Sequence, residues 1–199
     1  EGLNFVKKLF QIDGVTIIGG MSLTTAFLGF IYSISYTTAA VTLFMLALMP
    51  FLASLIAFIF LKEKISKQNF VSMVVAFIGT LVMIYASAFS GSFFGLIMGF
   101  ISSLGFAAFS VALRSKSDIK KFYILIYGGL FCALFSAFLM IINNQDFYIP
   151  IKNVYLSMTH GTLVASGLIL FSIGSKQLLS GELTMLSLLE VVGGIFWAW

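Results

Sequence analysis

The chain from Gly14 to Leu61 carries no charged side chain, and apolar residues run through it almost without interruption. Helices of a soluble domain need a polar face, which this stretch does not offer. At about 1.5 Å per helical residue it is long enough to cross a hydrocarbon core of about 30 Å twice. The pattern therefore predicts a hairpin of two membrane-spanning helices.

The same reasoning divides the whole chain into seven apolar segments, each except the last near the ~20 residues that a spanning helix needs. They are Thr16–Tyr36, Thr38–Leu61, Asn69–Ser87, Phe93–Leu113, Phe122–Ile142, Tyr155–Ser175 and Leu183–Trp199. The strands of a membrane barrel would alternate apolar and polar residues over about 10 positions, whereas these segments are continuously apolar. We therefore expect an all-α polytopic membrane protein, with spans one to seven in this order.

Composition agrees with this class. Hydrophobic residues make up 60% of the chain and charged residues 9%, against roughly 25% charged in an ordinary soluble domain. The single cysteine, Cys132, excludes an intrachain disulfide and is expected to serve in packing. The sequence has no zinc-ligand spacing, nucleophile elbow or glycine-rich phosphate loop, so we expect no cofactor, no metal site and no enzyme activity.

The basic residues predict the orientation of the spans. One side of the predicted membrane carries ten of them, namely Lys7, Lys8, Lys62, Lys64, Lys67, Arg114, Lys116, Lys120, Lys121 and Lys176, and the other side carries Lys152 alone. The positive-inside rule places the ten in the cytoplasm, on the same side as residue 1. We expect a multi-pass protein of a bacterial-type inner or plasma membrane. Because the loops are short, any function is expected to lie within the bilayer.

Two stretches of sequence resemble the EamA family of the drug/metabolite transporter (DMT) superfamily. The first is Tyr36-Thr37-Thr38-Ala39-Ala40, followed by Leu48-Met49-Pro50 and by Leu61-Lys62-Glu63-Lys64-Ile65-Ser66. The second, near the C-terminus, is Ser180-Gly181-Glu182-Leu183, followed by Leu188-Leu189-Glu190-Val191 and by Trp197-Ala198-Trp199. Two departures are that Lys62 stands where the family often has Gly, and Val191 where it often has Pro.

The resemblance implies an inverted-repeat bundle of five plus five helices. This chain then resembles a fragment holding helices three to nine, without the first two helices and the last. Residues 1–88 would form the C-terminal part of the first repeat, with three helices, and residues 91–199 a truncated second repeat with four. Aligning Met49-Pro50 with Glu190-Val191 pairs span two with span seven, in opposite directions across the membrane.

Glu190 is the strongest candidate for a functional residue, because it is the acidic residue predicted to lie well inside a span. A charge at the centre of a spanning helix costs roughly 2.5–3.5 kcal/mol on insertion scales. We expect it to couple protons or to bind substrate, and an interhelical hydrogen bond is the structural alternative. His160, the single histidine, is predicted at a different depth and is expected to serve in packing or at the interface.

Further candidates follow from position and resemblance. Five aromatic residues are candidates to line a substrate cavity, and packing or contact with lipid is their alternative role: Tyr32, Tyr36, Phe106, Phe109 and Trp197. Pro50 removes a backbone donor and frees the carbonyl of Leu46, which produces either a gating kink or a static bend. The resemblance suggests a role in the inner gate for Glu63, and a solvated loop charge is its alternative. Glu182 suits the start of a helix.

Gly91, Gly95, Gly99 and Ser103 recur every four residues, which predicts close packing of span four.

The predicted function is secondary transport, as an exporter of small metabolites or amino acids by alternating access, with proton coupling and passive exchange both open. A non-transporting scaffold or subunit is the alternative, and a polytopic membrane enzyme is a weaker one. The expected partners are a small-molecule substrate and the lipid bilayer, not nucleic acid, with a monomer and a homodimer both open.

Overall fold

The computed structural model describes residues 13–65, 92–116, 118–145 and 148–189, together with 67, 70–71, 73–75, 77–79, 82 and 193. Seven helices are defined in this part of the chain. They are α2 (Gly14–Tyr36), α3 (Ala39–Leu46), α4 (Met49–Phe60), α6 (Phe93–Arg114), α7 (Asp118–Ile142), α8 (Ile151–Gly174) and α9 (Ser180–Leu186).

Five stretches are long and apolar enough to cross a membrane: Gly14–Tyr36, Ala39–Phe60, Phe93–Arg114, Lys121–Ile142 and Ile151–Gly174. They confirm predicted spans one, two, four, five and six, with boundaries within about four residues. Predicted spans three and seven lie partly outside the described residues. The helix that opens span seven starts at Ser180, earlier than the predicted Leu183, and its first stretch ends at Leu186.

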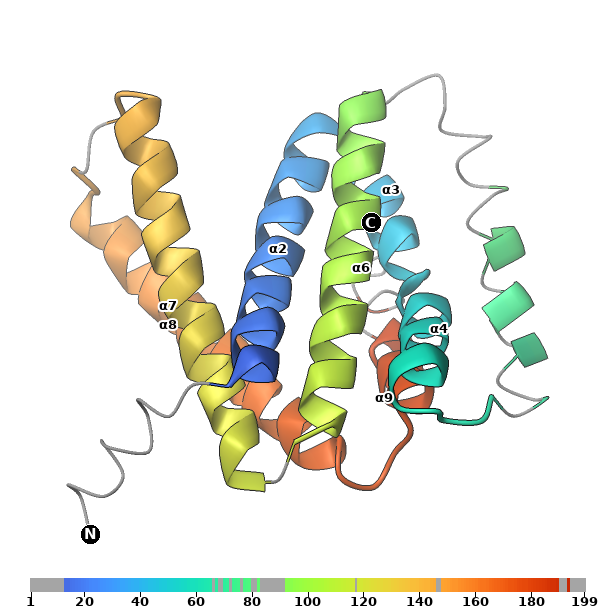
Figure 1. Ribbon diagram of the computed structural model, residues 1–199. Coiled ribbons are helices and arrows are strands. Elements are labelled where there is room, and N and C mark those ends of the chain that lie inside the picture. The colour runs from blue at the N-terminus through green and yellow to red at the C-terminus, as the bar shows by residue number, and fades with distance from the viewer. Residues whose placement is uncertain are drawn as a thin grey trace, which may run out of the picture.

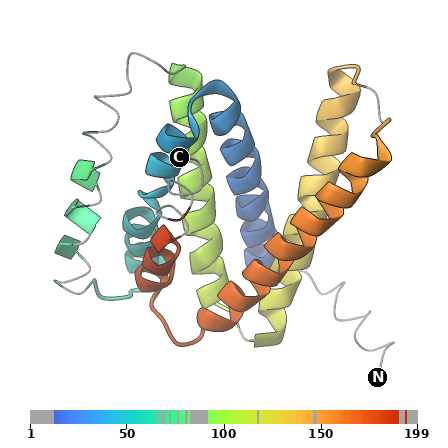
Figure 2. The same ribbon diagram turned by 180° about the vertical axis from the view of Figure 1, so that it is seen from behind.

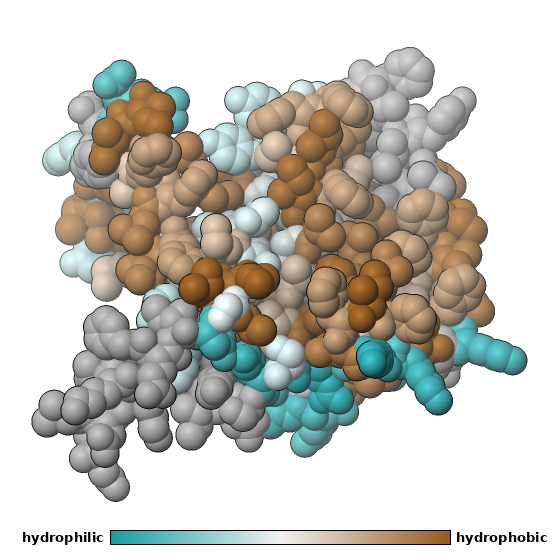
Figure 3. All heavy atoms as spheres, viewed as in Figure 1, coloured by the Kyte–Doolittle hydropathy of each residue, from teal (hydrophilic) through white to brown (hydrophobic). Residues whose placement is uncertain are grey.

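In Figure 1, α2 and α7 run upward, whereas α3, α4, α6 and α8 run downward. The start of α2, the end of α4, the end of α6 and the loop between α8 and α9 therefore share one end of the molecule. We call this the lysine-rich end, because Lys62, Lys64, Lys116 and Lys176 lie there and Lys152 lies at the start of α8, at the opposite end. Figure 3 shows hydrophilic side chains along this lower edge beneath a largely hydrophobic surface.

α6 lies at the centre of the bundle and contacts α2, α3, α4 and α9. Glycine allows its close approach to α2, because a Cβ atom on Gly29 would lie 2.7 Å from the carbonyl oxygen of Met98. A Cβ on Gly105 would lie 2.7 Å from the carbonyl oxygen of Ser22. Small residues thus let the two backbones meet almost directly.

The repeated small residues of span four pack as predicted. A Cβ on Gly95 would lie 2.4 Å from the Thr37 side chain, and one on Gly99 would lie 2.8 Å from the Cβ of Met45. Ser103, one turn further, is fully buried. The fourth member, Gly91, lies outside the described residues.

α7 and α8 form the outer part of the bundle, where Figure 2 shows α8 crossing obliquely. Ser172 is the buried residue of α8, and most of its other side chains are exposed. The exposed side chains include many large apolar ones, such as Leu163 at 68% and Leu170 at 69%. Such a surface suits contact with lipid or with further helices.

The second span is not one continuous helix. α3 ends at Leu46, α4 begins at Met49, and Ala47 and Leu48 form a turn between them. Pro50 lies in the first turn of α4, where its missing N–H costs least. The predicted single helix Thr38–Leu61 is therefore corrected to two half-helices, because the proline cannot supply the hydrogen bond that would continue the first one.

Candidate functional site

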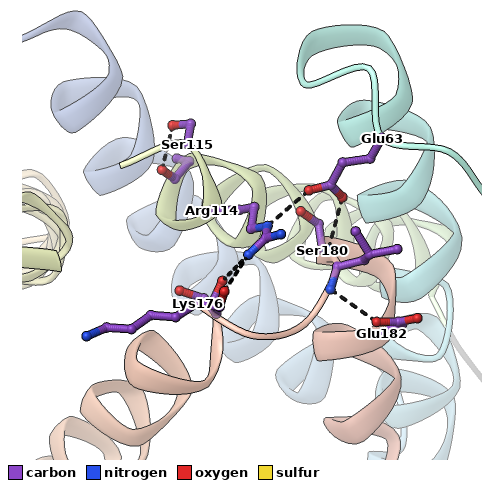
Figure 4. Close-up of polar contacts among 9 residues, drawn as sticks. Glu63, Arg114, Ser115, Lys176, Ser180 and Glu182 are labelled. Atoms are coloured by element: carbon purple, nitrogen blue, oxygen red, sulfur yellow. Dashed lines mark hydrogen bonds and ion pairs between the residues drawn. The ribbon is translucent and has the colours of Figure 1, made fainter. Parts of the chain in front are cut away.

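The ends of four helices meet at the lysine-rich end in one group of polar contacts (Figure 4). Glu63 follows α4, Arg114 ends α6, Ser175 and Lys176 follow α8, and Ser180 begins α9. We call these five residues the Glu63–Arg114 cluster. It joins segments that are up to 117 residues apart in sequence.

Glu63 is the carboxylate at the centre of this cluster. Its Oε1 atom lies 3.2 Å from Nε of Arg114, and its Oε2 accepts a hydrogen bond of 3.2 Å from the backbone N–H of Ser180. The side chain is 15% exposed. Both carboxylate oxygens thus have donors from other helices, so this acidic residue joins three elements at once.

A tight turn brings Glu63 to this position. Lys62 has φ of 55°, in the left-handed region, and the N–H of Glu63 returns to the carbonyl of Ala57 at 3.3 Å. A helix end of this kind favours glycine, which has no Cβ to strain. Lys62 stands where the family often has Gly, and the positive φ gives that preference a physical reason.

Arg114 makes three contacts from one guanidinium group. Besides Glu63, it donates from Nη1 to the carbonyl oxygens of Ser175, at 3.1 Å, and of Lys176, at 2.8 Å. These carbonyls lie at the C-terminal end of α8, where the helix dipole favours a positive charge. The planar guanidinium can hold several acceptors in fixed directions, which a lysine ammonium cannot do in the same way.

The first turn of α9 fits tightly against α4. A Cβ on Gly181 would lie 1.9 Å from the hydroxyl oxygen of Ser54. Glu182 accepts a hydrogen bond from the N–H of Leu179 at 3.1 Å, which confirms that this acid suits a helix start. A hollow of about 10 Å³ between these segments has room for about one water molecule, so α4 and α9 are closed against each other here.

A second ion pair lies at the same end. Asp13 precedes α2 and caps it, accepting a hydrogen bond of 2.9 Å from the N–H of Thr16. Its other oxygen pairs with the ammonium group of Lys116, just after α6. The hydrogen bonds from Lys116 and Thr16 lower the pKa of Asp13 from 3.8 to about 2. The end of α6 is therefore tied to α2 as well as to α4 and α8.

The break in the second span is the other unusual feature. The hydroxyl of Ser103 on α6 donates to the carbonyl of Met45, which also accepts from the N–H of Leu48. Nearby, the hydroxyls of Ser33 and Thr42 share a hydrogen bond of 2.9 Å while both side chains are fully buried. Ser103 of α6 thus adds a donor to a backbone carbonyl at the break, and the Ser33–Thr42 bond joins α2 to α3 beside it.

The predicted cavity residues that are described lie in two aromatic groups. Tyr32 and Tyr36 pack edge-on against Phe94, with ring centroids 6.3 and 5.1 Å apart. Phe106 and Phe109 both pack against Phe171 of α8. Phe109 is completely buried in the core around Leu23 and Leu113.

Of the remaining residues singled out in the sequence, some are described by the structure and some are not. Glu190 and Trp197 lie outside the described residues. His160 is exposed on the outer surface of α8, and Cys132 is partly buried on α7. Their predicted roles remain predictions.

An open groove of about 370 Å³ lies between α2 and α7. Its walls include Thr24 and Thr25 of α2 and apolar side chains of α7 such as Phe131 and Phe135. Both threonine hydroxyls are already bonded to carbonyl oxygens, Thr24 to that of Gly128 and Thr25 to that of Met21. The groove therefore presents apolar walls, and none of the predicted site residues that the structure describes lines it.

Sequence reasoning found Glu63 but not its partner. In the sequence, Arg114 contributes only to the charge pattern that predicts orientation, and Ser180 belongs only to a motif of the family resemblance. One available signal was that Arg114 is the single arginine in a chain whose other basic residues are all lysine. An arginine at the end of a span is suited to bridging several acceptors.

The described helices, their apolar surfaces and the polar lysine-rich end define a polytopic helical membrane protein. Residues 6–85 match the family model of the EamA-like transporter family, which confirms the resemblance for the first of the two stretches of sequence, Tyr36 to Ser66. No curated protein and no solved structure matches the chain. The residues after 85 lie outside the family match, so the predicted second repeat remains a prediction.

Proposed function

We propose that the chain forms part of a secondary transporter that exports small metabolites or amino acids by alternating access. The observation that carries this proposal is the match of residues 6–85 to a transporter family, in a chain whose described helices are built to span a membrane. Transporters of this general kind move a substrate by rocking helical repeats against each other around a central site.

In this proposal the Glu63–Arg114 cluster is a gate. It ties α4 to α6 and to the start of α9, directly beside the tight contact between Gly181 and Ser54. A pathway between α4 and α9 would require these contacts to separate. With the lysine-rich end in the cytoplasm, as the positive-inside rule expects, the cluster is the inner gate and is closed in the arrangement described above.

The broken second span supplies a place for the movement. Half-helices can change their relative angle more easily than one continuous helix, because the turn at Ala47 and Leu48 lacks the full set of helix hydrogen bonds. α4 carries Glu63 at its far end, so a small change of angle at the break moves the carboxylate away from Arg114. Pro50 in this role is a hinge rather than a static bend.

The contact between α4 and α9 also suits the predicted inverted repeat. The repeat hypothesis pairs the second span with the seventh, which opens with α9, and these two pack against each other from opposite directions. Equivalent elements that meet in this way are expected near an approximate twofold axis. Glu190 remains the proposed site of proton coupling, with passive exchange as the alternative.

Export from cells that express the full-length protein tests the proposal. We expect at least one metabolite to accumulate outside cells with the wild-type protein and not with empty vector. Glu63→Gln and Arg114→Lys should reduce this export at least about fivefold, while Glu182→Gln, which removes a neighbouring carboxylate that does not contact Arg114, should stay within about twofold. No accumulation from protein verified in the membrane would contradict the exporter and favour a scaffold.

Cross-linking tests the gate separately from the substrate. Ile65 and Leu179 line the same small hollow on either side of the α4–α9 contact. In a Cys132→Ala background, Ile65→Cys with Leu179→Cys should be joined by a short, reducible bifunctional thiol reagent. Transport should stop on cross-linking and return on reduction, with each single cysteine variant unaffected. Continued transport in the cross-linked protein would rule out a gate at this position.

A further inference from the structure

We propose that Lys62, Lys64 and the exposed last turn of α4 bind an anionic phospholipid, and that this lipid stabilises the inward position of Glu63. The proposed ligand has two parts, a negatively charged headgroup for the lysines and an acyl chain for the apolar turn. The inference goes beyond transport and does not depend on it. We call Lys62, Lys64, Phe58, Ile59 and Phe60 the α4 lipid surface.

The charge of this surface is the first argument. Among the described residues, the two ion pairs are Glu63 with Arg114 and Asp13 with Lys116, and neither involves Lys62 or Lys64. Both of these lysines are exposed. Basic residues beside a spanning helix attract anionic headgroups, each contributing about fivefold in affinity.

The position of Glu63 between the two lysines is the second argument. Its carboxylate points inward, with Oε1 paired to Arg114 and Oε2 bonded to the N–H of Ser180. Its negative charge is therefore compensated by another helix. The positive charges of Lys62 and Lys64 are therefore not neutralised by the carboxylate of Glu63, although that residue lies between them in sequence.

The apolar part of the surface lies directly before the lysines. Phe58, Ile59 and Phe60 form the last turn of α4 and are 56%, 60% and 75% exposed. Lys62 and Lys64 follow Phe60 within four residues, so the charged side chains come directly after the exposed apolar turn. A phospholipid presents the same order of chemistry, an acyl chain below and a charged phosphate above.

The effect on Glu63 follows from these contacts. An outward Glu63 would lie among Lys62 and Lys64, where it would pair with them and repel a phosphate. Lipid therefore binds more tightly when Glu63 is turned inward, and by linkage its binding favours that arrangement. Anionic lipid is thus expected to hold the Glu63–Arg114 cluster closed.

Lipid binding to the purified full-length protein tests the first part. Phosphatidylglycerol and phosphatidylcholine with identical acyl chains are titrated separately, and the bound fraction is measured by native mass spectrometry. We expect tighter binding of phosphatidylglycerol, weakened about 25-fold by Lys62→Gln with Lys64→Gln and changed less than about twofold by Lys152→Gln at the opposite end. Equal affinity for the two lipids, or an equal loss in Lys152→Gln, would overturn the proposal.

The cross-link between Ile65→Cys and Leu179→Cys tests the second part without any transport measurement. Its yield should be higher in phosphatidylglycerol than in phosphatidylcholine, and the difference should vanish when Lys62 and Lys64 are both glutamine. Equal yields in both lipids would show that bound lipid does not act on the cluster. Unchanged phosphatidylcholine binding by the glutamine variant checks that it is folded.

Discussion

The hydroxyl of Ser103 donates to the main-chain carbonyl of Met45, although the two residues are 58 positions apart in sequence. Met45 lies at the end of α3, where the second span breaks, and Ser103 lies in the middle of α6. The Met45 carbonyl also accepts from the N–H of Leu48 in the turn, and Ser103 gives it a second donor at a depth where the hydrocarbon core offers no water. The central helix therefore supports the irregular backbone of its neighbour.

Ser103→Ala should lower the free energy of unfolding by about 1 kcal/mol, because the carbonyl of Met45 loses its hydroxyl donor. Reversible unfolding in mixed micelles measures this value. Ser166→Ala is the matched control, since Ser166 is exposed and bonds within its own helix, to the carbonyl of Thr162. If both variants are equally stable, the contact with Met45 contributes nothing to folding.

Gly99→Ala should destabilise the protein by about 1–3 kcal/mol, because the new Cβ would lie 2.8 Å from the Cβ of Met45 and force α3 away from α6. Gly161→Ala provides the comparison, since nothing lies within 4 Å of a Cβ on that residue. There alanine should be neutral or stabilising by up to about 1 kcal/mol, as expected for an open helix position. Reversible unfolding in mixed micelles compares the two variants. If Gly99→Ala is as stable as the wild type, α3 and α6 do not approach as closely as described.

Lys62→Gly should raise the free energy of unfolding by about 1 kcal/mol. The residue has φ of 55°, which strains any side chain with a Cβ and does not strain glycine. Lys62→Ala removes the same charge but keeps the Cβ, so it should show no such gain. A gain of equal size in both variants would attribute the effect to charge rather than to backbone strain.

The Asp13–Lys116 pair predicts a specific dependence on pH. Because the folded protein lowers the pKa of Asp13 from 3.8 to about 2, the ionised form stabilises the fold. This contribution is fully present above about pH 4 and is lost as the pH falls through about 2. The stability difference between wild type and Asp13→Asn should therefore be constant above pH 4 and disappear toward pH 2. A difference that persists at pH 2 would exclude the carboxylate as its source.

The sequence predicted the five spans that the structure describes in full and the lysine-rich end, because these depend on local properties. A run of apolar residues and its flanking charges can be recognised without knowledge of the fold. Pro50 likewise predicted a missing hydrogen bond in the second span. It did not predict whether the helix would bend there or break into two. In each case the physical cause lies within a few residues of its effect.

The partner of Glu63 could not be predicted in the same way. Arg114 is 51 residues away from it, and the carbonyls that complete the cluster are 61 and 62 residues from Arg114. No periodicity connects such positions, since their meeting depends on how four helices pack. The aromatic candidates show the same limit. Phenylalanine is so common in this chain that its type does not single out Phe109. Its complete burial depends on how α2, α6 and α8 pack together.

The central place of α6 has a consequence for biogenesis. A membrane protein is inserted from its N-terminal side as it is synthesised. α2, α3 and α4 therefore enter the bilayer before α6 exists, with the carbonyl of Met45 lacking its serine donor and Glu63 lacking its arginine. These earlier helices have few contacts with one another, because most of their contacts are with α6. Their packing is therefore completed only after residue 114 has left the ribosome. That interval is when quality-control proteases and chaperones would most readily recognise the nascent chain.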